Sequence, residues 1–214
     1  MHTLRLLTAI VVAAPLLTSC ATAYYRALET VGIEKRDILV DRVEEARDSQ
    51  TEAKEQFTSA LDRYRSVVKV EGGDLEQVYD RLEREFERSE ARAKAVQDRV
   101  AAVESVGNDL FAEWENEIGD YSDPNLRRQS QRLMTDTRAE YRRLIASMQR
   151  AEAAMDPVLT LFRDQVLYLR HNLNARAIGS LETELTDIER ATAKLIAEME
   201  RSIAEASRFI EGLA

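Results

Sequence analysis

Few side chains in this 214-residue sequence have the types and spacings that enzymes use for catalysis. A Glu-x-x-His di-iron ligand pair would need a glutamate three residues before His171, and Tyr168 stands there. No glycine-rich loop is followed by Lys-Ser or Lys-Thr, as a phosphate-binding loop requires. Carboxylates such as Glu113 and Glu115 are typical of the solvated surface of a long helix. The sequence therefore predicts a protein that is not an enzyme and binds no cofactor or metal.

Cys20 is the single cysteine, so it has no partner for an intrachain disulfide. It follows a start whose one basic residue is Arg5 and an apolar run of twelve residues from Leu6 to Leu17. That run is shorter than the roughly 20 residues that cross a bilayer as a helix, which is typical of a cleaved export signal. Leu17-Thr18-Ser19-Cys20 resembles the lipobox of bacterial lipoproteins, where cleavage precedes the cysteine and the thiol carries a diacylglycerol. We expect residues 1–19 to be the signal peptide and Cys20 to be lipidated.

The residue after the lipobox bears on location. In lipoproteins of this kind Ala21, unlike an aspartate, implies the cell outer membrane, and we expect the chain to be lipid-anchored there and to face the periplasm. The lipid on Cys20 would hold it on the membrane, because several acyl chains bind a bilayer where one chain is marginal. The net charge of −9 argues against nucleic acid as a partner. An envelope protein is the expected partner, and a homo-oligomer is left open.

Hydrophobic periodicity predicts long helices. Only 7 Gly and 3 Pro punctuate the chain, and from Val43 to Val67 apolar residues recur in alternating steps of three and four, with Gln50 the polar exception. The expected helices span about 34–71, 74–118, 124–172 and 177–212, after a short tether over 20–33. A helix of about 65 Å needs an equally long partner to cover its apolar stripe. The prediction is an all-α fold, an elongated antiparallel helical bundle or coiled coil of about four long helices, with 34–214 as a single domain.

Two prolines mark the third expected helix. Asp123 and Pro124 have the positions of an N-cap and a first helical residue. Pro157 lies further along, where the apolar phase continues without a break, and this favours a kink. The alternative is that Asp156 and Pro157 cap and begin a separate helix.

Charge is distributed unevenly on either side of the turn near residue 121. Residues 104–123 hold seven acids and no base, whereas 126–150 hold seven arginines and two acids. An antiparallel hairpin would place these stretches side by side, so pairing between helices explains the arginines. A site for phosphate or an anionic lipid headgroup is the alternative, and Arg127, Arg128, Arg132 and Arg142 are its candidate residues.

Asn172 and Asn174 lie at a break in the apolar phase. Their amides can cap helix ends or bind the backbone of a partner, and capping is the interpretation that we favour.

Three segments carry a family resemblance: Ala23-Tyr24-Tyr25, residues 31–48 and residues 162–178. Together they resemble the proteobacterial lipoproteins filed as domain of unknown function 2959. The resemblance covers nearly the whole chain after the lipobox and implies no catalytic or binding residues. We expect a scaffold or interaction protein of the envelope, with an accessory subunit of an envelope transport or assembly complex as the alternative.

Overall fold

The computed structural model describes residues 35–68, 75–172 and 175–213, without the side chains of 175–178 and 180. The predicted signal peptide, Cys20 and the predicted tether lie outside the described residues, as does Asn174. The described part is helical, with α2 (Lys35–Val68), α3 (Leu75–Ile118), α4 (Pro124–Ala153), α5 (Met155–His171) and α6 (Ala175–Leu213). These bounds confirm the predicted all-α bundle of four long rods, since α4 and α5 form one rod in two segments.

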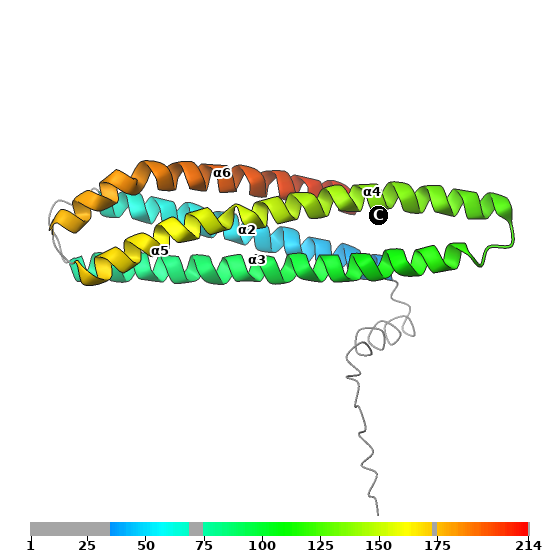
Figure 1. The fold of residues 1–214 in the computed structure, drawn as a ribbon, viewed down its shortest axis with the longest axis horizontal. Coiled ribbons are helices and arrows are strands. Elements are labelled where there is room, and N and C mark those ends of the chain that lie inside the picture. Colours follow the sequence, from blue (N-terminus) through cyan, green and yellow to red (C-terminus); the bar gives the residue numbers. More distant parts are fainter. Residues whose placement is uncertain (1–34, 69–74, 173–174, 214) are drawn as a thin grey trace, which may run out of the picture.

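The helices run up and down along a single axis (Figure 1). Both α2 and the α4–α5 rod pack against α3 on one side and α6 on the other, so each rod has two antiparallel neighbours. The core runs the length of the bundle instead of gathering at its centre. All eight positions of the stripe predicted from Val43 to Val67 are buried, and Tyr64 hydrogen-bonds the carbonyl of Leu181 across the core at 3.0 Å.

The α4–α5 rod bends at Ala154, three residues before Pro157. Pro157 has no N–H to donate to the carbonyl of Ala153, so the helical ladder loses a bond there. The backbone of Ala154 keeps helical angles (φ −75°, ψ −13°), and its N–H donates to the carbonyl of Arg150 at 3.1 Å. No side chain caps the start of α5. The two segments thus meet at a residue with helical backbone angles, and α5 begins at Met155, before Asp156 and Pro157.

The hairpin of α3 and α4 extends past the start of α2 and the end of α6 (right-hand side of Figure 1). Its turn is built as predicted, because the Asp123 carboxylate accepts the N–H of Asn125 at 2.7 Å and Pro124 begins α4. Leu126 and Leu133 are 50% and 58% exposed. They lie on the apolar stripe of α4, but this stripe continues beyond the helices that would cover it.

Candidate functional site

A groove between α4 and α6, which we call the α4–α6 groove, is lined mainly by arginines and small side chains. Its volume is about 650 Å³, and small side chains make its floor. Five arginines line it, three from α4 and two from α6: Arg142, Arg143, Arg150, Arg201 and Arg208.

Two carboxylates of α6, seven residues apart, hold most of these arginines. Glu205 lies 4.0 Å from Nε of Arg143 and also accepts from Arg208. Glu198 repeats the pattern one heptad earlier, where Arg150 Nε is 3.9 Å from its Oε2 atom and Arg201 pairs with Oε1. Both carboxylates are largely shielded, with side chains 15% and 22% exposed for Glu198 and Glu205. We call these two rungs the arginine–glutamate ladder, and they fix how far α4 can slide along α6.

The ladder corrects the predicted charge pairing. Among the seven arginines of 126–150, Arg138 is the one whose ion pair crosses to α3 in the described structure, at 3.1 Å from Glu115. Its guanidinium also donates to the carbonyl of Phe111 at 3.1 Å and lies over the Phe111 ring. The arginines of α4 do form ion pairs with a neighbouring helix, but that helix is mainly α6. The expectation overlooked Glu198-x-x-Arg201 and Glu205-x-x-Arg208, whose seven-residue repeat is visible in the sequence.

The candidate interaction residues do not form one site. Arg127 donates to the carbonyl of Tyr121 at 2.6 Å and Arg128 to the side chain of Asn125, so both brace the hairpin turn. The guanidinium of Arg132 has no hydrogen bond or ion pair with any described residue, and neither does that of Arg142 in the α4–α6 groove. The structure thus places three of the four arginines on the overhanging hairpin and the fourth in the groove.

Asn172 lies at the opposite end of the rod, at the C-terminus of α5. Its side-chain amide donates to the carbonyl of Tyr168 at 2.9 Å, and its backbone N–H donates to the carbonyl of Leu169 at 3.1 Å. These bonds satisfy carbonyls that the end of the helix leaves free, so the capping interpretation of Asn172 is confirmed. Asn174 and Cys20 lie outside the described residues.

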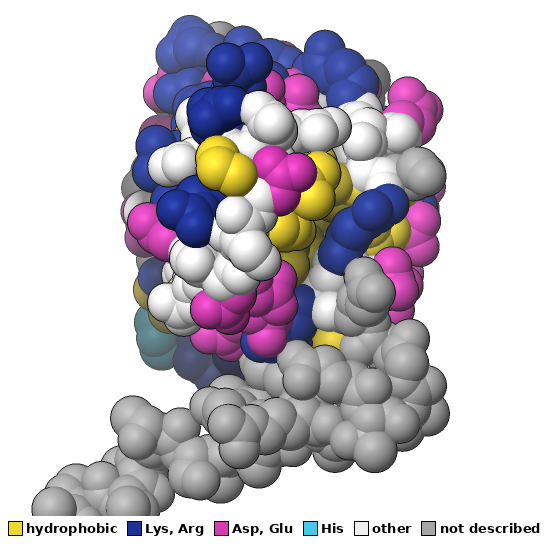
Figure 2. All heavy atoms as spheres, turned by 90° about the vertical axis from the view of Figure 1, so that its right-hand side faces the viewer, with side chains coloured by type: hydrophobic (Ala, Val, Ile, Leu, Met, Phe, Trp, Pro, Cys, Tyr) yellow, Lys and Arg dark blue, Asp and Glu magenta, His cyan; other side chains and the backbone are white. Residues whose placement is uncertain are grey.

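A second groove, lined by several large apolar side chains, opens where the hairpin leaves α2 and α6. We call it the crotch groove. It measures about 470 Å³ and combines residues of all four rods: Arg36, Leu110, Glu113, Trp114, Glu117, Leu133, Thr137, Gly212 and Leu213. Figure 2, which views this end of the bundle, shows hydrophobic side chains between the charged ones. Trp114 stacks on Phe111 and donates from Nε1 to Ser130 at 2.9 Å.

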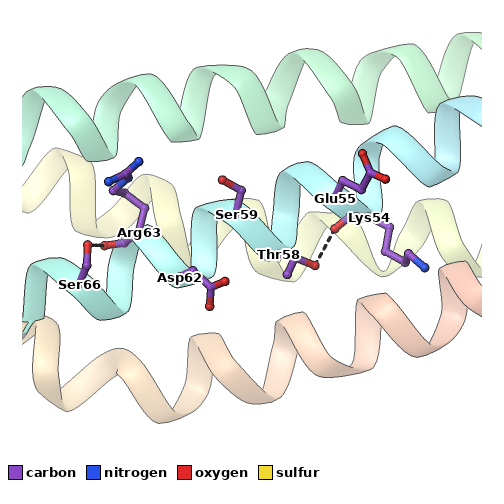
Figure 3. Close-up of a pocket in the computed structure, with 7 residues that line it drawn as sticks. All are labelled: Lys54, Glu55, Thr58, Ser59, Asp62, Arg63 and Ser66. Carbon is purple, nitrogen blue, oxygen red and sulfur yellow. Dashed lines mark hydrogen bonds between the residues drawn. The ribbon is translucent and has the colours of Figure 1, made fainter.

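A third surface, along α2, has the features of a solvated helix face. Its lining residues, from Lys54 to Ser66, all belong to α2 and point to different sides of it (Figure 3). The hydroxyls of Thr58 and Ser66 donate to carbonyls of α2 itself, at 2.8 and 2.7 Å. These side chains do not converge on a common point.

Burial is the main cause of a raised pKa at three titratable groups of the described structure. Burial raises the pKa of Tyr141 to about 12, with Glu104 adding to the shift, and burial with Glu184 raises the pKa of Tyr64 further. Burial, Glu104 and Asp156 raise the pKa of Glu152. The tyrosines face backbone carbonyls of the core, and Glu152 belongs to neither groove, so the shifts reflect packing.

His171 is exposed at the end of α5, and the described residues contain no group of three metal-ligating side chains. No described helix has a stretch apolar and long enough to cross a bilayer.

Comparison with known proteins places the chain in a family. A search of curated proteins finds no match. One family model, described as protein of unknown function (DUF2959), matches residues 24–213 and so spans all the helices described above. The chain therefore belongs to this family.

Proposed function

We propose that this chain is a lipoprotein of the bacterial outer membrane, held there through Cys20 and facing the periplasm. The support is the apolar run that ends in Leu17-Thr18-Ser19-Cys20, followed by Ala21. The first described helix begins at Lys35, fifteen residues after Cys20, so only a short stretch of chain would separate the lipid from that helix. Several acyl chains on one cysteine are enough to hold a folded domain on a membrane.

The proposed role is that of a non-enzymatic scaffold, and the rod shape carries this proposal. The core continues from one end of the bundle to the other, and the arginine–glutamate ladder sets the register of α4 on α6. A rod built in this way holds surfaces at defined distances from its anchor. Its partners would be the membrane and an envelope protein, with no nucleic acid.

A second candidate is an accessory subunit of an envelope transport or assembly complex. The overhanging hairpin favours it, because Tyr121 and Leu126 near its turn and Leu133 further along α4 expose large apolar side chains on a two-helix projection. Such a projection suits insertion into a partner.

Metabolic labelling with a clickable fatty acid tests the anchor. The wild-type protein should take up label, and Cys20→Ala should lose it and leave the signal uncleaved or cleaved elsewhere. Thr22→Ala, which changes the same segment without removing the thiol, should label like the wild type. A wild-type protein without label would reject the lipoprotein proposal.

Co-purification in mild detergent separates the two roles. A single partner in fixed stoichiometry, lost when Leu126 and Leu133 are both changed to Asp, would favour the accessory subunit. Partners that crosslink along the length of the rod, and that tolerate those two substitutions, would favour the scaffold.

A further inference from the structure

The α4–α6 groove continues past Arg150 along the same side of the rod. A second hollow of about 610 Å³ shares Arg150 with it, and Ala153, Ala191 and Lys194 are among the residues that line this continuation. We call the two hollows together the basic groove. Seven bases and three acids line it, on a chain whose net charge is −9. The basic groove thus concentrates positive charge on one side of an acidic protein.

Cations repeat along both rims of the basic groove at intervals of seven residues. Arg143 and Arg150 have this spacing on α4, and Lys194, Arg201 and Arg208 have it on α6. Seven residues of helix rise about 10.5 Å, so the charges are spread along the groove instead of converging on one point. A small anion needs converging donors, whereas cations in rows at this interval fit the side chains of another helix.

Three of these cations keep donors that the bundle does not use. Arg143 and Arg150 lie 3.8 Å or more from the carboxylates with which they pair, which is beyond hydrogen-bond distance. Lys194 has no hydrogen bond or ion pair with any described residue. Carboxylates from outside can therefore bind these three side chains without displacing one of their hydrogen bonds.

The outer face of α2 carries acids at the same interval. Four exposed carboxylates follow one another in steps of seven, each two residues after one buried position of the stripe and two before the next. Two residues turn a helix by about 200°, so the four acids lie on the side of α2 opposite the core. We call them the α2 acidic row: Asp41, Asp48, Glu55 and Asp62.

The α2 acidic row is only lightly paired within the bundle. Asp48 and Asp62 form ion pairs with arginines of α2 itself, at 3.0 and 3.1 Å. Asp41 and Glu55 have no hydrogen bond or ion pair with any described residue. The four acids do not converge, as the ligands of a small cation would. They form a straight row, which is the shape that a long groove accepts.

Contacts between α2 and α6 place the two surfaces at the same level of the rod. Lys54 of α2 pairs with Glu200 at 3.6 Å, and Arg65 pairs with Glu189 at 2.7 Å. The α6 rim from residue 194 to residue 208 therefore runs beside the part of α2 that bears the acidic row. Two rods that lie side by side can bring the row of one against the groove of the other without an axial shift.

We propose that the basic groove binds the α2 acidic row of a second copy of this chain. Each copy contributes a row on one side and a groove on another, so the contact is heterologous and the assembly continues beyond a dimer unless it closes into a ring. The inference does not depend on lipidation. If Cys20 is lipidated, copies anchored side by side in one membrane would already be held at the level at which the two surfaces match.

Sedimentation velocity of residues 20–214 with Cys20→Ser, which prevents disulfide-linked dimers, tests the contact. At low salt the sedimentation coefficient should rise with protein concentration and pass the value of a dimer. High salt should remove this rise, because exposed ion pairs are individually weak and are screened.

Two double variants separate the partners of the contact. The groove variant combines Arg142→Glu with Lys194→Glu, and the row variant combines Asp41→Lys with Glu55→Lys. None of these four side chains has a described partner, so the melting transition should stay as in the parent. Each variant alone should remain monomeric. Their equimolar mixture should form a dimer and nothing larger, because one intact row and one intact groove remain for each pair of molecules.

Arg84→Glu with Arg132→Glu is the matched control. It makes the same change in charge as the groove variant at two exposed arginines that belong to neither surface, so it should associate like the parent.

Three outcomes would overturn the proposal. A parent chain that stays monomeric at low salt at every concentration would show that the two surfaces do not bind. A groove variant that associates like the parent would place the contact elsewhere. A monomeric parent that binds phosphatidylglycerol vesicles but not phosphatidylcholine vesicles, with binding lost in the groove variant, would identify an anionic lipid headgroup as the occupant.

Discussion

Among the described glycines, Gly107 has the least room for a side chain. A Cβ atom there would lie 2.3 Å from ring atoms of Tyr141, a buried side chain whose hydroxyl donates to the carbonyl of Val103 at 3.3 Å. Gly179 also lies in a helix, but nothing comes within 4 Å of its added Cβ. The two glycines therefore share a helical backbone and differ in the space around them.

Gly107→Ala should destabilise the protein, and Gly179→Ala should stabilise it. Alanine gains about 0.8–1 kcal/mol over glycine in a helix, and this gain is the main effect at Gly179. At Gly107 the displacement of Tyr141 should cost about 1–3 kcal/mol and outweigh that gain. Urea unfolding of both variants measures the two signs, and a stabilising Gly107→Ala would mean that the Tyr141 ring can move freely.

Glu152 gives a stability that depends on pH. Its raised pKa, caused by burial and then by Glu104 and Asp156, means that the folded state binds the proton more tightly than the unfolded state. The stabilisation is complete below the ordinary glutamate pKa, about 4.3, and is lost as the pH rises through the raised value. Glu152→Gln should therefore be more stable than wild type at pH 7 and no more stable near pH 4.

Melting temperatures across this pH range measure the Glu152 effect. Glu87→Gln is the control, because it removes one negative charge from an exposed position of α3. A benefit of the same size from Glu87→Gln would assign the effect to net charge instead of to the surroundings of Glu152.

Between elements, the arginine–glutamate ladder is the contact that selects a register. Its two rungs repeat after seven residues on both α4 and α6, so α4 cannot slide by one turn without separating Arg143 from Glu205 and Arg150 from Glu198. Small residues such as Ala146 and Ala204 line the groove between these pairs. The ladder therefore adds charge complementarity to the apolar contacts between α4 and α6.

Reversing Arg143 and Arg150 to Glu should lower the free energy of unfolding, and adding Glu198→Arg with Glu205→Arg should restore part of the loss. Each exposed pair contributes only about 0.2–1 kcal/mol, so the multiple exchange is needed. Chemical denaturation at low and high salt measures the loss, which should shrink when salt screens the charges.

Arg132→Glu with Arg142→Glu is the matched control for the ladder. It makes the same change in net charge at guanidinium groups without a described partner, so stability should change little. An equal loss in ladder and control variants would attribute the effect to net charge.

The whole molecule is a rod, and its length follows from uninterrupted helices. The 44 residues of α3 span about 66 Å, and the hairpin carries the rod beyond the ends of α2 and α6. In solution, the chain from residue 20, with Cys20→Ser to keep it free of lipid, should have a radius of gyration well above the ~16 Å of a compact chain of 195 residues. Small-angle scattering at several concentrations measures this value, and a value near the compact one would require the helices to fold back on themselves.

The sequence alone was enough to predict the class of the fold. Scarce glycine and proline and a stripe in steps of three and four specify long amphipathic helices, and every stripe position from Val43 to Val67 is buried. The cap at Asp123 and the interruption of the helix near Pro157 could also be predicted from the sequence. A capping side chain and a missing backbone N–H each affect only the adjacent turn of helix, so no knowledge of the tertiary structure is needed.

The tertiary structure decided which faces of these helices have partners. Leu126 and Leu133 are exposed although the apolar stripe of α4 includes them, because a stripe records only that a face is apolar and burial depends on where the neighbouring helices end. The partners of the arginines were decided in the same way. The sequence predicts that the arginines of 126–150 pair with the acids of α3, which are nearest along the chain. A helix in a four-rod bundle has two neighbours, and the rotation of α4 about its axis points Arg143 and Arg150 toward α6. Helix length and rotation are set by packing over the whole bundle, so they cannot be read from one helix at a time.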